Sequence, residues 1–562
     1  MCVCALSMFI SACGAPQAGP PSTPTPEATP VPVNSVVLAT ATSGPASISI
    51  APSIPDALRQ AGLASGASLA KEEKLASARL EIAQSIDVVE GHPVFTEGQA
   101  IWFYALVAPF PTVVDGVRYD ELKQAWAGSQ PLAFAGKPLV MAESTYEAMK
   151  FIFGAEAAAG AMHIVPAEGL VDALWQGGPQ WGVVPFESLG PKLKVLEIDG
   201  QSPVRKVFNE EDYPLRMTFV CLGVGCAKVR LPVTNRDPSK LTTVIMTGVT
   251  ALVRATAYKM EVNGVLYPGR DIRATLREAD IAHISNEIPF AEDCPPPVWH
   301  SNRLVFCSNP AYIDLLEDVG TDVVELTGNH MEDWNQKAMR FTLQLYKDHD
   351  LPVYGGGADL AASHRAATLE RNGEKFAFLG CNPVGPDFAW ANVDWPGAAP
   401  CGDYQWMVDE IKRLKQQGYI VIVTFQYYEY YSPEPRPGQR EVFRMIAEAG
   451  ADVVSGSQAH SAQAMEFDKA AFIHYGLGNL FFDQMNVTDY SRYEFLDRYV
   501  FYAGRLFSVD LVTAMLQDYS QPTPMGPADR ADFLTYIFQA SGWLPKGPYT
   551  GPKPTPTLVP LP

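Results

Sequence analysis

The second half of this chain contains a series of continuous apolar segments, each of which ends in polar or small residues. They read "LTTVIMTGV", "ADIAHISNEIPF", "GTDVVELTGNHMEDW", "KFAFLGCNP", "YIVIVTFQYYEYY", "GADVVSGSQAHSAQ" and "AFIHYGLGNLFF". Strands that are apolar on both faces lie between two covering layers, as parallel or mixed sheets do. Helical patterns such as "QWMVDEIKRLKQQG" separate them. The pattern therefore predicts an α/β sandwich whose polar strand ends meet along one rim.

The first half predicts a different α/β unit, over residues 47–230. Helical "SIPDALRQAGL" alternates with strand-like "AIWFYALVAPF" and "WGVVPF", and such alternation favours an open α/β sheet. The stretches "WGVVPFESLGPKLKVLEIDGQSP" and "YPLRMTFVCLG" resemble a periplasmic solute-binding domain of the phosphate-binding type. The expected fold class is thus a periplasmic-binding-protein-like α/β domain followed by an α/β sandwich domain.

Two interpretations remain open for "STYE", at residues 144–147 of that first unit. Ser144 and Thr145 could open a helix whose backbone amides hold a small anion. Alternatively, Ser144 is only a helix N-cap, with Glu147 completing a capping box. The sequence favours the cap.

The N-terminus has the pattern of an exported, anchored protein. "MCVCALSMFISACG" is apolar and too short to span a bilayer. Its end, Ile10 to Cys13, resembles the lipobox of bacterial lipoproteins, although a basic n-region is missing. The Pro/Thr-rich "APQAGPPSTPTPEATPVPV" that follows predicts an extended spacer. We therefore expect lipidation at Cys13 and a location on the extracytoplasmic face of the cell membrane; the alternative is a free cysteine in a short buried segment.

Apart from Cys2, Cys4 and Cys13 at the N-terminus, the chain has six cysteines, and these predict disulfides. An even number in an exported chain suggests a disulfide framework, and six cysteines allow fifteen connectivities. No pair has the C-x-x-C spacing typical of zinc sites. The preferred pairing joins neighbours in the sequence: Cys221 with Cys226, Cys294 with Cys307, and Cys381 with Cys401.

Composition and linkers set the remaining limits. The formal net charge is −20 and the pI is near 4.9, which argues against a nucleic-acid partner because such proteins carry a basic stripe. A polar stretch, "AKVRLPVTNRDPSK", predicts a linker before the second domain. The expected bounds are a signal peptide at 1–13, a tether at 14–46, a solute-binding-like domain at 47–230, a sandwich domain at 241–545 and a disordered Pro-rich tail at 546–562.

The polar strand ends of the second domain carry carboxylate, amide and imidazole groups. Glu287 follows one strand, Asn329 and His330 follow the next, and His460 follows the last. Such groups at the ends of separate strands are typical of the active site of a metal-assisted hydrolase. Taken singly, each residue is also explained as a solvated or hydrogen-bonded strand end.

The order of these motifs resembles the capsule-synthesis CapA family, also called poly-γ-glutamate synthesis proteins. The matching segments run from "ADIAHISNEIPF" through "GTDVVELTGNHMEDW" and "LPVYGGGADLAASHRAA" to "GADVVSGSQAHSAQAMEF" and "IHYGLGNLFFD", over residues 241–485. The resemblance implies a metallophosphoesterase-like fold and a role in envelope polymer synthesis or processing. It also implies a polymer or anionic small molecule as ligand and other polymer-synthesis proteins as partners.

By the same resemblance, Glu287, Asn329 and His460 would be metal ligands, and His330 would donate a proton or stabilise charge. The cofactor would be one divalent ion (Mn, Mg or Zn) or none. These roles are implied by the family pattern and not by spacing alone.

The chain departs from the family pattern at three expected ligands. Val249 stands where the family has aspartate, and Gln426 and Gln458 stand where it has histidine, whereas Glu429 is kept as a catalytic-site residue. Valine has no lone pair, and a glutamine carbonyl is uncharged and suits zinc or manganese less well than imidazole does. The sequence therefore leaves three possibilities open: a weak metal-dependent hydrolase, a pseudoenzyme that binds a polymer or anion, and a solute sensor whose N-terminal domain is the functional part.

The aromatic run "FQYYEYYSPEPRP" is also open to two interpretations. Its tyrosines could pack as a rim of the fold. They could instead form a platform on which a sugar or polymer chain stacks, since tyrosine offers a large contact area at low entropic cost.

Overall fold

The computed structural model describes residues 46–83, 88–89, 92–93, 98–176, 180–299, 305–488 and 490–547. The predicted lipidation site Cys13, the signal peptide, the tether up to residue 45 and the tail from residue 548 lie outside the described residues. Among the described residues, every helix is too short or too polar to cross a membrane.

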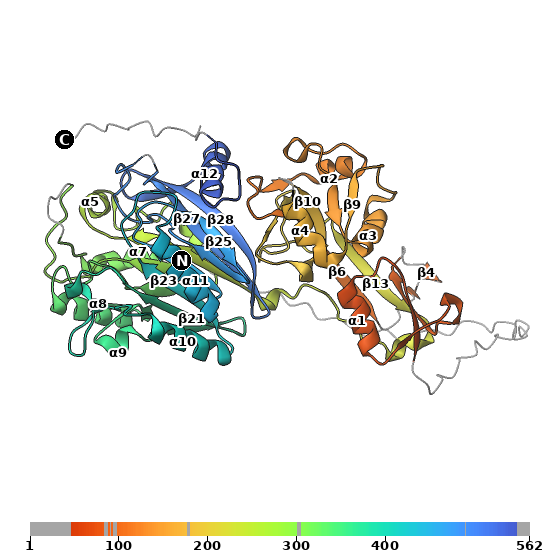
Figure 1. Ribbon diagram of the computed structural model, residues 1–562, viewed down its shortest axis with the longest axis horizontal. Coiled ribbons are helices and arrows are strands. Elements are labelled where there is room, and N and C mark those ends of the chain that lie inside the picture. Colours follow the sequence, from red (N-terminus) through yellow and green to blue (C-terminus); the bar gives the residue numbers. More distant parts are fainter. Residues whose placement is uncertain are drawn as a thin grey trace, which may run out of the picture. The chain divides into compact units, whose positions relative to one another are not determined.

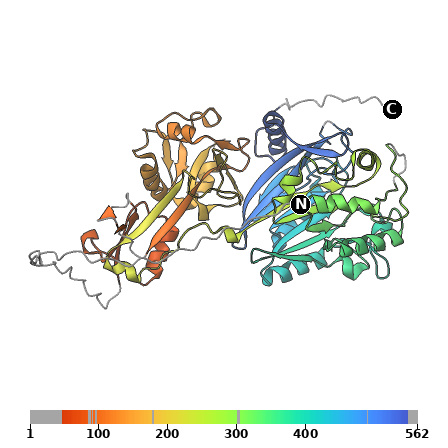
Figure 2. The same cartoon turned by 180° about the vertical axis from the view of Figure 1, so that it is seen from behind.

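The first half of the described chain is built on a 9-stranded mixed sheet in the order β2-β1-β3-β13-β6-β10-β8-β9, with β11 paired to β6. Figure 2 shows the two long strands β6 and β13 side by side, and they are antiparallel. The strands are β1 (Ser47–Ile50), β2 (Ser68–Leu69), β3 (Ala78–Ile82), β6 (Gln99–Pro109), β8 (Leu139–Met141), β9 (Met162–Ile164), β10 (Trp181–Pro185), β11 (Leu193–Val195) and β13 (Arg216–Leu222).

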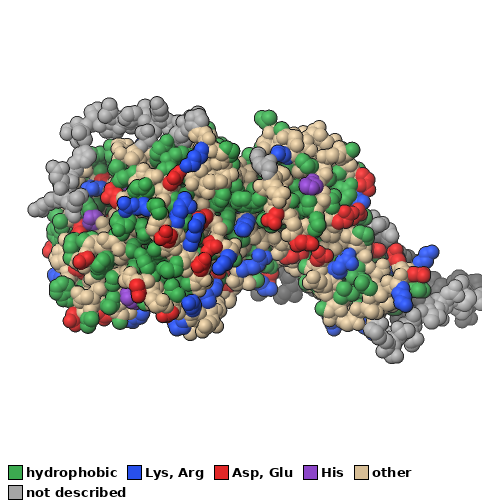
Figure 3. All heavy atoms as spheres, viewed as in Figure 1, with side chains coloured by type: hydrophobic (Ala, Val, Ile, Leu, Met, Phe, Trp, Pro, Cys, Tyr) green, Lys and Arg blue, Asp and Glu red, His purple; other side chains and the backbone are tan. Residues whose placement is uncertain are grey.

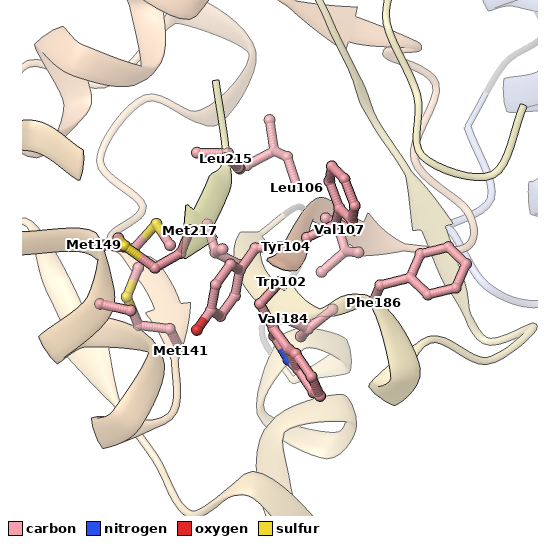
Figure 4. Packing of buried hydrophobic residues seen from close by; sticks show 14 of the residues in the cluster. Trp102, Tyr104, Leu106, Val107, Met141, Met149, Val184, Phe186, Leu215 and Met217 are labelled. Carbon is pink, nitrogen blue, oxygen red and sulfur yellow. The ribbon is translucent and has the colours of Figure 1, made fainter. Parts of the chain in front are cut away.

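The core of this sheet is centred on β6, which is buried on both faces along most of its length. Figure 4 shows Tyr104 of this strand among other buried side chains of the core, such as Trp102 and Val184. The elements around the sheet are α1 (Asp56–Ala64), α2 (Tyr119–Trp126), α3 (Glu143–Phe153), α4 (Leu170–Trp175) and the short strand pairs β4 (Val88–Val89) with β5 (His92–Pro93) and β7 (Gly116–Val117) with β12 (Glu197–Ile198).

The predicted N-cap at Ser144 is wrong. Helix α3 begins at Glu143, its N-cap is Ala142, and no side chain caps it. Ser144 is therefore the second residue of the helix, and Glu147 pairs with Lys150 at 2.7 Å instead of completing a capping box.

The second half contains two further sheets. The first has the order β18-β17-β16-β14-β27-β28-β29 with β15 paired to β16, and the second has the order β20-β21-β23-β24-β26-β25. The strands of the first are β14 (Leu241–Thr247), β15 (Val249–Thr250), β16 (Ile281–Asn286), β17 (Val323–Glu325), β18 (Val353–Tyr354), β27 (Tyr493–Tyr502), β28 (Arg505–Gln517) and β29 (Gln521–Pro524). Those of the second are β20 (Ala367–Arg371), β21 (Glu374–Cys381), β23 (Ile420–Gln426), β24 (Val453–Ser457), β25 (Met465–Asp468) and β26 (Ala471–His474).

These two sheets and their helices form four layers. Along β21, Phe376 and Phe378 enter a core shared with strands of the first sheet, whereas Ala377 and Leu379 enter a core shared with α10 and α11. The outer face of the first sheet is covered by α5 to α8. The helices of this half are α5 (Arg254–Asn263), α6 (Arg273–Arg277), α7 (Ile313–Asp318), α8 (Gln336–Asp348), α9 (Leu360–Ser363), α10 (Gln405–Gln416), α11 (Pro437–Ala449) and α12 (Pro527–Ala540), and Figure 1 labels all of them except α6. A small strand pair, β19 (Gly356–Gly357) with β22 (Gly397–Ala398), completes the fold.

The predicted fold class, a mixed α/β unit followed by an α/β sandwich, is confirmed. The three predicted disulfides are also present: Cys221–Cys226, Cys294–Cys307 and Cys381–Cys401. The exact domain bounds stay a prediction.

The predicted linker is more firmly held than its polar composition indicates. Arg236 is buried, and its side chain donates to the backbone oxygen of Pro203 at 2.7 Å and to Glu210 at 2.6 Å. A buried arginine needs such partners, so this stretch is part of the folded structure.

Charged side chains of both signs are interspersed on the face seen in Figure 3, where Lys and Arg lie among Asp and Glu. The structure also contains close ion pairs, such as Arg444 with Glu466 at 2.6 Å. Each exposed pair of this kind adds little to stability.

Candidate functional site

The polar strand ends are positioned by parallel strands of both sheets. β14, β16 and β17 are parallel in the first sheet, and β23 and β24 are parallel in the second. Two of the following turns touch directly, because a Cβ at Gly328 would lie 2.3 Å from the backbone oxygen of Glu287. Only glycine permits so close an approach, and it brings the "GNH" turn against Glu287.

Three amide side chains form one hydrogen-bonded chain across the two sheets. Gln426 donates from Nε2 to Asn329 Oδ1 at 3.1 Å and to Gln458 Oε1, and Ser457 donates to Gln426 Oε1 at 2.6 Å. Gln426 therefore uses both of its N–H groups and its carbonyl oxygen within the protein. The two glutamines that replace expected histidines bind each other.

His330 is held between two carboxylates. Its Nδ1 lies 2.6 Å from Asp333 Oδ2, which also accepts a hydrogen bond from the backbone of Phe306, and its Nε2 lies 3.8 Å from Glu287 Oε1. Burial lowers the pKa of His330, but the Asp333 hydrogen bond and the Glu287 charge outweigh burial and raise it above its usual value. The dyad can hold a proton at the site.

Glu287 has one carboxylate oxygen that is available to a ligand. It is only 2% exposed, and its Oε2 is buried without a hydrogen-bond partner among the described residues. A buried unpartnered carboxylate oxygen costs free energy, so this atom is a place where a ligand N–H or O–H group, a water or a cation would be accepted.

Val249 lies in an apolar cluster at the centre of the site. Val249 is fully buried, and it lies in one cluster with the buried Phe306 and Phe482, which belong to separate segments of the chain. Phe306 lies 4.7 Å from the ring of His330, and Phe482 lies 5.2 Å from the ring of His460. Apolar side chains thus occupy the space beside the valine that replaces the expected aspartate.

Arg254 brings a permanent positive charge to the same cluster. Its guanidinium lies 5.2 Å from the ring of Phe306 and 4.9 Å from that of Phe482, and its Nε lies 3.1 Å from Asp483. Its φ is +46°, in the left-handed region that favours glycine. Strained residues of this kind cluster at ligand sites.

His460 is oriented by an amide. Its Nδ1 lies 2.8 Å from Asn479 Oδ1, and the backbone of Asn479 pairs with that of Val249. His460 and Gln458 both have positive φ, +50° and +73°, so the loop after β24 turns sharply at each.

Glu429 lies apart from the buried part of the site. Its side chain is exposed and accepts a hydrogen bond from Tyr431, whose hydroxyl oxygen also lies 2.6 Å from Gln484 Oε1. Burial and the hydrogen bond to Glu429 raise the pKa of Tyr431. With Arg254, these residues line a pocket of about 440 Å³.

The structure brings together Glu287 with His330, and Asn329 with Gln426 and Gln458, whereas His460 is joined to Asn479 and Phe482. These residues do not supply the donors of a two-metal centre, because an apolar cluster surrounds Val249 and the glutamines bind each other. Within the described chain, His, Cys, Asp and Glu form no group of three suited to a metal ion. The assigned ligand and catalytic roles stay predictions.

Arg254, Phe306, Phe482 and Asn479 were missed by the sequence analysis. Asn479 and Phe482 lie in "GLGNLFF", where a lone amide inside an apolar run was a usable signal. Arg254 ends the apolar stretch "TALVR" and was a similar signal. The position of Phe306 has no comparable signal in the sequence.

A small cavity of about 110 Å³ lies at the start of α3 in the first half of the chain. Ser144, Thr145 and Glu187 line it, and the buried Thr145 hydroxyl has no hydrogen-bond partner among the described residues. Anion binding here stays a prediction, which a thermal-shift titration with phosphate tests.

Glu494 of β27 is a buried carboxyl close to the Asn479 turn. A Cβ at the adjoining Gly478 would lie 3.5 Å from the Cβ of Glu494. Both carboxyl oxygens of Glu494 are buried without a hydrogen-bond partner among the described residues, and burial raises its pKa well above the usual value. Burial therefore favours the neutral form of this carboxyl group.

Comparison with known proteins supports the sequence resemblance. Residues 243–484 match the family model of the bacterial capsule synthesis protein PGA_cap. The PGA biosynthesis protein CapA of Bacillus subtilis (strain 168) is 30% identical over 179 residues, 32% of this chain and 47% of that protein. The capsule biosynthesis protein CapA of Bacillus anthracis is 26% identical over 260 residues, 45% of this chain and 62% of that protein.

The match therefore spans about half to three fifths of these curated relatives. Among solved structures, a putative 5'-nucleotidase from Staphylococcus aureus in complex with α-ketoglutarate aligns with a TM-score of 0.32 and 12% identity, over 54% of this chain and 59% of that one.

Proposed function

Because residues 243–484 match the family model of the bacterial capsule synthesis protein PGA_cap and resemble two curated CapA proteins, we propose that this chain takes part in handling a capsule or envelope polymer such as poly-γ-glutamate. In this proposal the rim of the sandwich domain binds the polymer and does not hydrolyse it. The chain acts as a surface binding module, together with other polymer-synthesis proteins.

The observation that carries this proposal is the Asn329–Gln426–Gln458 chain of hydrogen bonds. Amides that satisfy one another bind a cation weakly, since binding would first have to break those bonds. The buried apolar cluster around Val249 acts in the same direction. The rim keeps groups that suit polar ligands: the unpartnered Glu287 oxygen and the His330–Asp333 dyad.

The competing proposal is a weak hydrolase that uses one divalent ion (Mn, Mg or Zn) on Glu287, Asn329 and His460, with His330 and Glu429 assisting. In the structure Asn329 Oδ1 already accepts a hydrogen bond from Gln426. A single ion would therefore have to compete for that oxygen, and we rank this function second.

Calorimetric titration of the full chain with poly-γ-glutamate distinguishes the two. We expect measurable binding whose Kd is the same, within about twofold, in EDTA and in MnCl₂, and no shortening of the polymer. Metal analysis of the purified protein serves as the control. A full equivalent of bound metal together with manganese-dependent cleavage would establish the hydrolase, and no polymer binding under either condition would remove the proposed function.

We further propose that the chain is anchored to the extracytoplasmic face of the membrane through a lipid on Cys13. A Cys13→Ala chain should move from the membrane pellet to the soluble fraction of a bacterial host, because stable anchoring depends on the attached acyl chains. Cell fractionation with an antibody against the folded domain measures this. Cys4→Ala is the matched control and should stay in the pellet; a Cys13→Ala chain that also stays there contradicts the anchor.

A further inference from the structure

An exposed aromatic and basic surface lies in the loop between β23 and α11. It consists of Tyr428, Tyr430 and Arg436. The two tyrosines are 46% and 37% exposed, and the guanidinium of Arg436, which is also exposed, lies 4.3 Å from the ring of Tyr428 and 5.4 Å from that of Tyr430. A guanidinium stacked on aromatic faces keeps its edge N–H groups free for an acceptor.

Arg436 has no carboxylate partner among the described residues. Other arginines of α11 are paired, as Arg440 and Arg444 are with Glu466. The nearby carboxylate of Glu434 is paired with Lys546 at 2.6 Å, and that of Glu429 accepts from Tyr431. In a chain with a formal charge of −20, an exposed arginine held on two rings without an acidic partner is a place for an external anionic group.

The surface is held in a fixed shape. Tyr427 is buried, with its ring 5.3 Å from that of Tyr428 and 6.0 Å from that of Phe443. The backbone oxygens of Ser432 and Pro433 accept hydrogen bonds from Gln463 at 3.0 Å and from Ala464 at 2.7 Å. A preformed aromatic surface loses little conformational entropy on binding.

The other side of the same loop lines the pocket beside the candidate site. Glu429 and Tyr431, which alternate with Tyr428 and Tyr430, line the 440 Å³ pocket together with Arg254 and Asp483. A chain molecule lying on the exposed tyrosines could therefore continue into the pocket at the strand ends.

We propose that Tyr428, Tyr430 and Arg436 form a docking surface for a linear polymer with carboxylate side groups, leading to the pocket at Arg254. This inference rests on the proposed function and names the residues that hold the polymer. The carboxylate binds the edge of the Arg436 guanidinium, in which two parallel N–H groups match two oxygens. The aliphatic segments between carboxylates lie on the tyrosine rings, which offer apolar area next to a hydroxyl. One stacked arginine fits spaced carboxylates; the dense phosphates of a nucleic acid require a basic stripe.

The test measures binding of the full chain to poly-γ-glutamate of defined length by calorimetry. Tyr428→Ala/Tyr430→Ala should raise the Kd at least about tenfold and Arg436→Gln about tenfold, as buried tyrosine and arginine anchors do elsewhere. Arg436→Lys keeps the charge but loses the planar fork, and should restore only part of the affinity. Polymer whose carboxylates are esterified should bind as weakly as Arg436→Gln.

Matched controls are Tyr258→Ala, an equally exposed tyrosine on α5, and Arg413→Gln, an exposed arginine on α10. Both should bind like the unmodified chain. All substituted residues are exposed, so each variant should fold normally, which circular dichroism verifies.

The outcomes separate two failures. If the unmodified chain binds the polymer and the tyrosine and Arg436 variants bind it equally well, the docking surface is wrong while the proposed function stands. If the unmodified chain does not bind, both fall. If the esterified polymer binds equally well, the proposal that carboxylates bind Arg436 is wrong. If single-stranded DNA binds more tightly through the same residues, the proposed polymer is the wrong partner.

Discussion

Replacing Val249 by aspartate should lower the free energy of unfolding by about 3 kcal/mol, because it places a charge among buried apolar side chains. Val249 is fully buried with Phe306 and Phe482, and the neighbouring Arg254 is already bound to Asp483. Urea unfolding of the variant and the unmodified chain at pH 7 measures the loss. Val249→Thr, which keeps the shape without the charge, is the control and should lose less.

The same aspartate should help to bind a metal ion when Gln426 and Gln458 are also replaced by histidine. In the triple variant Val249→Asp/Gln426→His/Gln458→His, Mn²⁺ at a hundredfold excess over its Kd should raise the free energy of unfolding by about 2.7 kcal/mol. The free energy of unfolding of the unmodified chain should not change with Mn²⁺. A response of equal size in the unmodified chain would mean that its own donors already bind the ion. No response in the triple variant would mean that more than the three ligands separates this rim from a metal centre.

Replacing Glu494 by glutamine should stabilise the protein at pH 8 by about 2 kcal/mol and leave it nearly unchanged at pH 4.5. Burial raises the pKa of Glu494 in the folded state. Below the unfolded-state pKa both states are protonated. As the pH rises further, the unfolded state releases its proton first, so the folded state loses stability until the folded pKa is passed. Glutamine has no proton to release and removes this loss.

Thermal unfolding at the two pH values checks the prediction. Glu441→Gln, at an exposed position of α11, is the control and should have little effect at either pH. A Glu494→Gln variant that is destabilised equally at both pH values would show that the carboxyl has a partner and is not held neutral by burial.

The layers of the sandwich domain were predictable because its strands are apolar on both faces. The alternation of Phe376 and Phe378 with Ala377 and Leu379 between two cores is the structural form of that pattern. The convergence of Glu287 and the "GNH" turn also followed from the sequence, since parallel strands place their ends on one rim.

Side-chain partners were not predictable in the same way. The bond between Gln426 and Gln458 joins residues 32 positions apart, and it depends on rotamers that no local pattern encodes. Helix α3 shows a related limit: "STYE" has the letters of a capping box, but the chain already turns at Ala142, so Ser144 lies inside the helix. Local signals compete with tertiary packing, and packing decided both cases.

The amide chain across the two sheets determines how this contact between them responds to pH. Imidazole changes its charge near pH 6.5, whereas a carboxamide does not titrate at any physiological pH. With Gln426 bound to Asn329 and Gln458, this seam between the sheets keeps the same bonds in acidified and neutral medium. A pair of histidines there would repel once protonated, whereas the bonds between the glutamines do not change with pH.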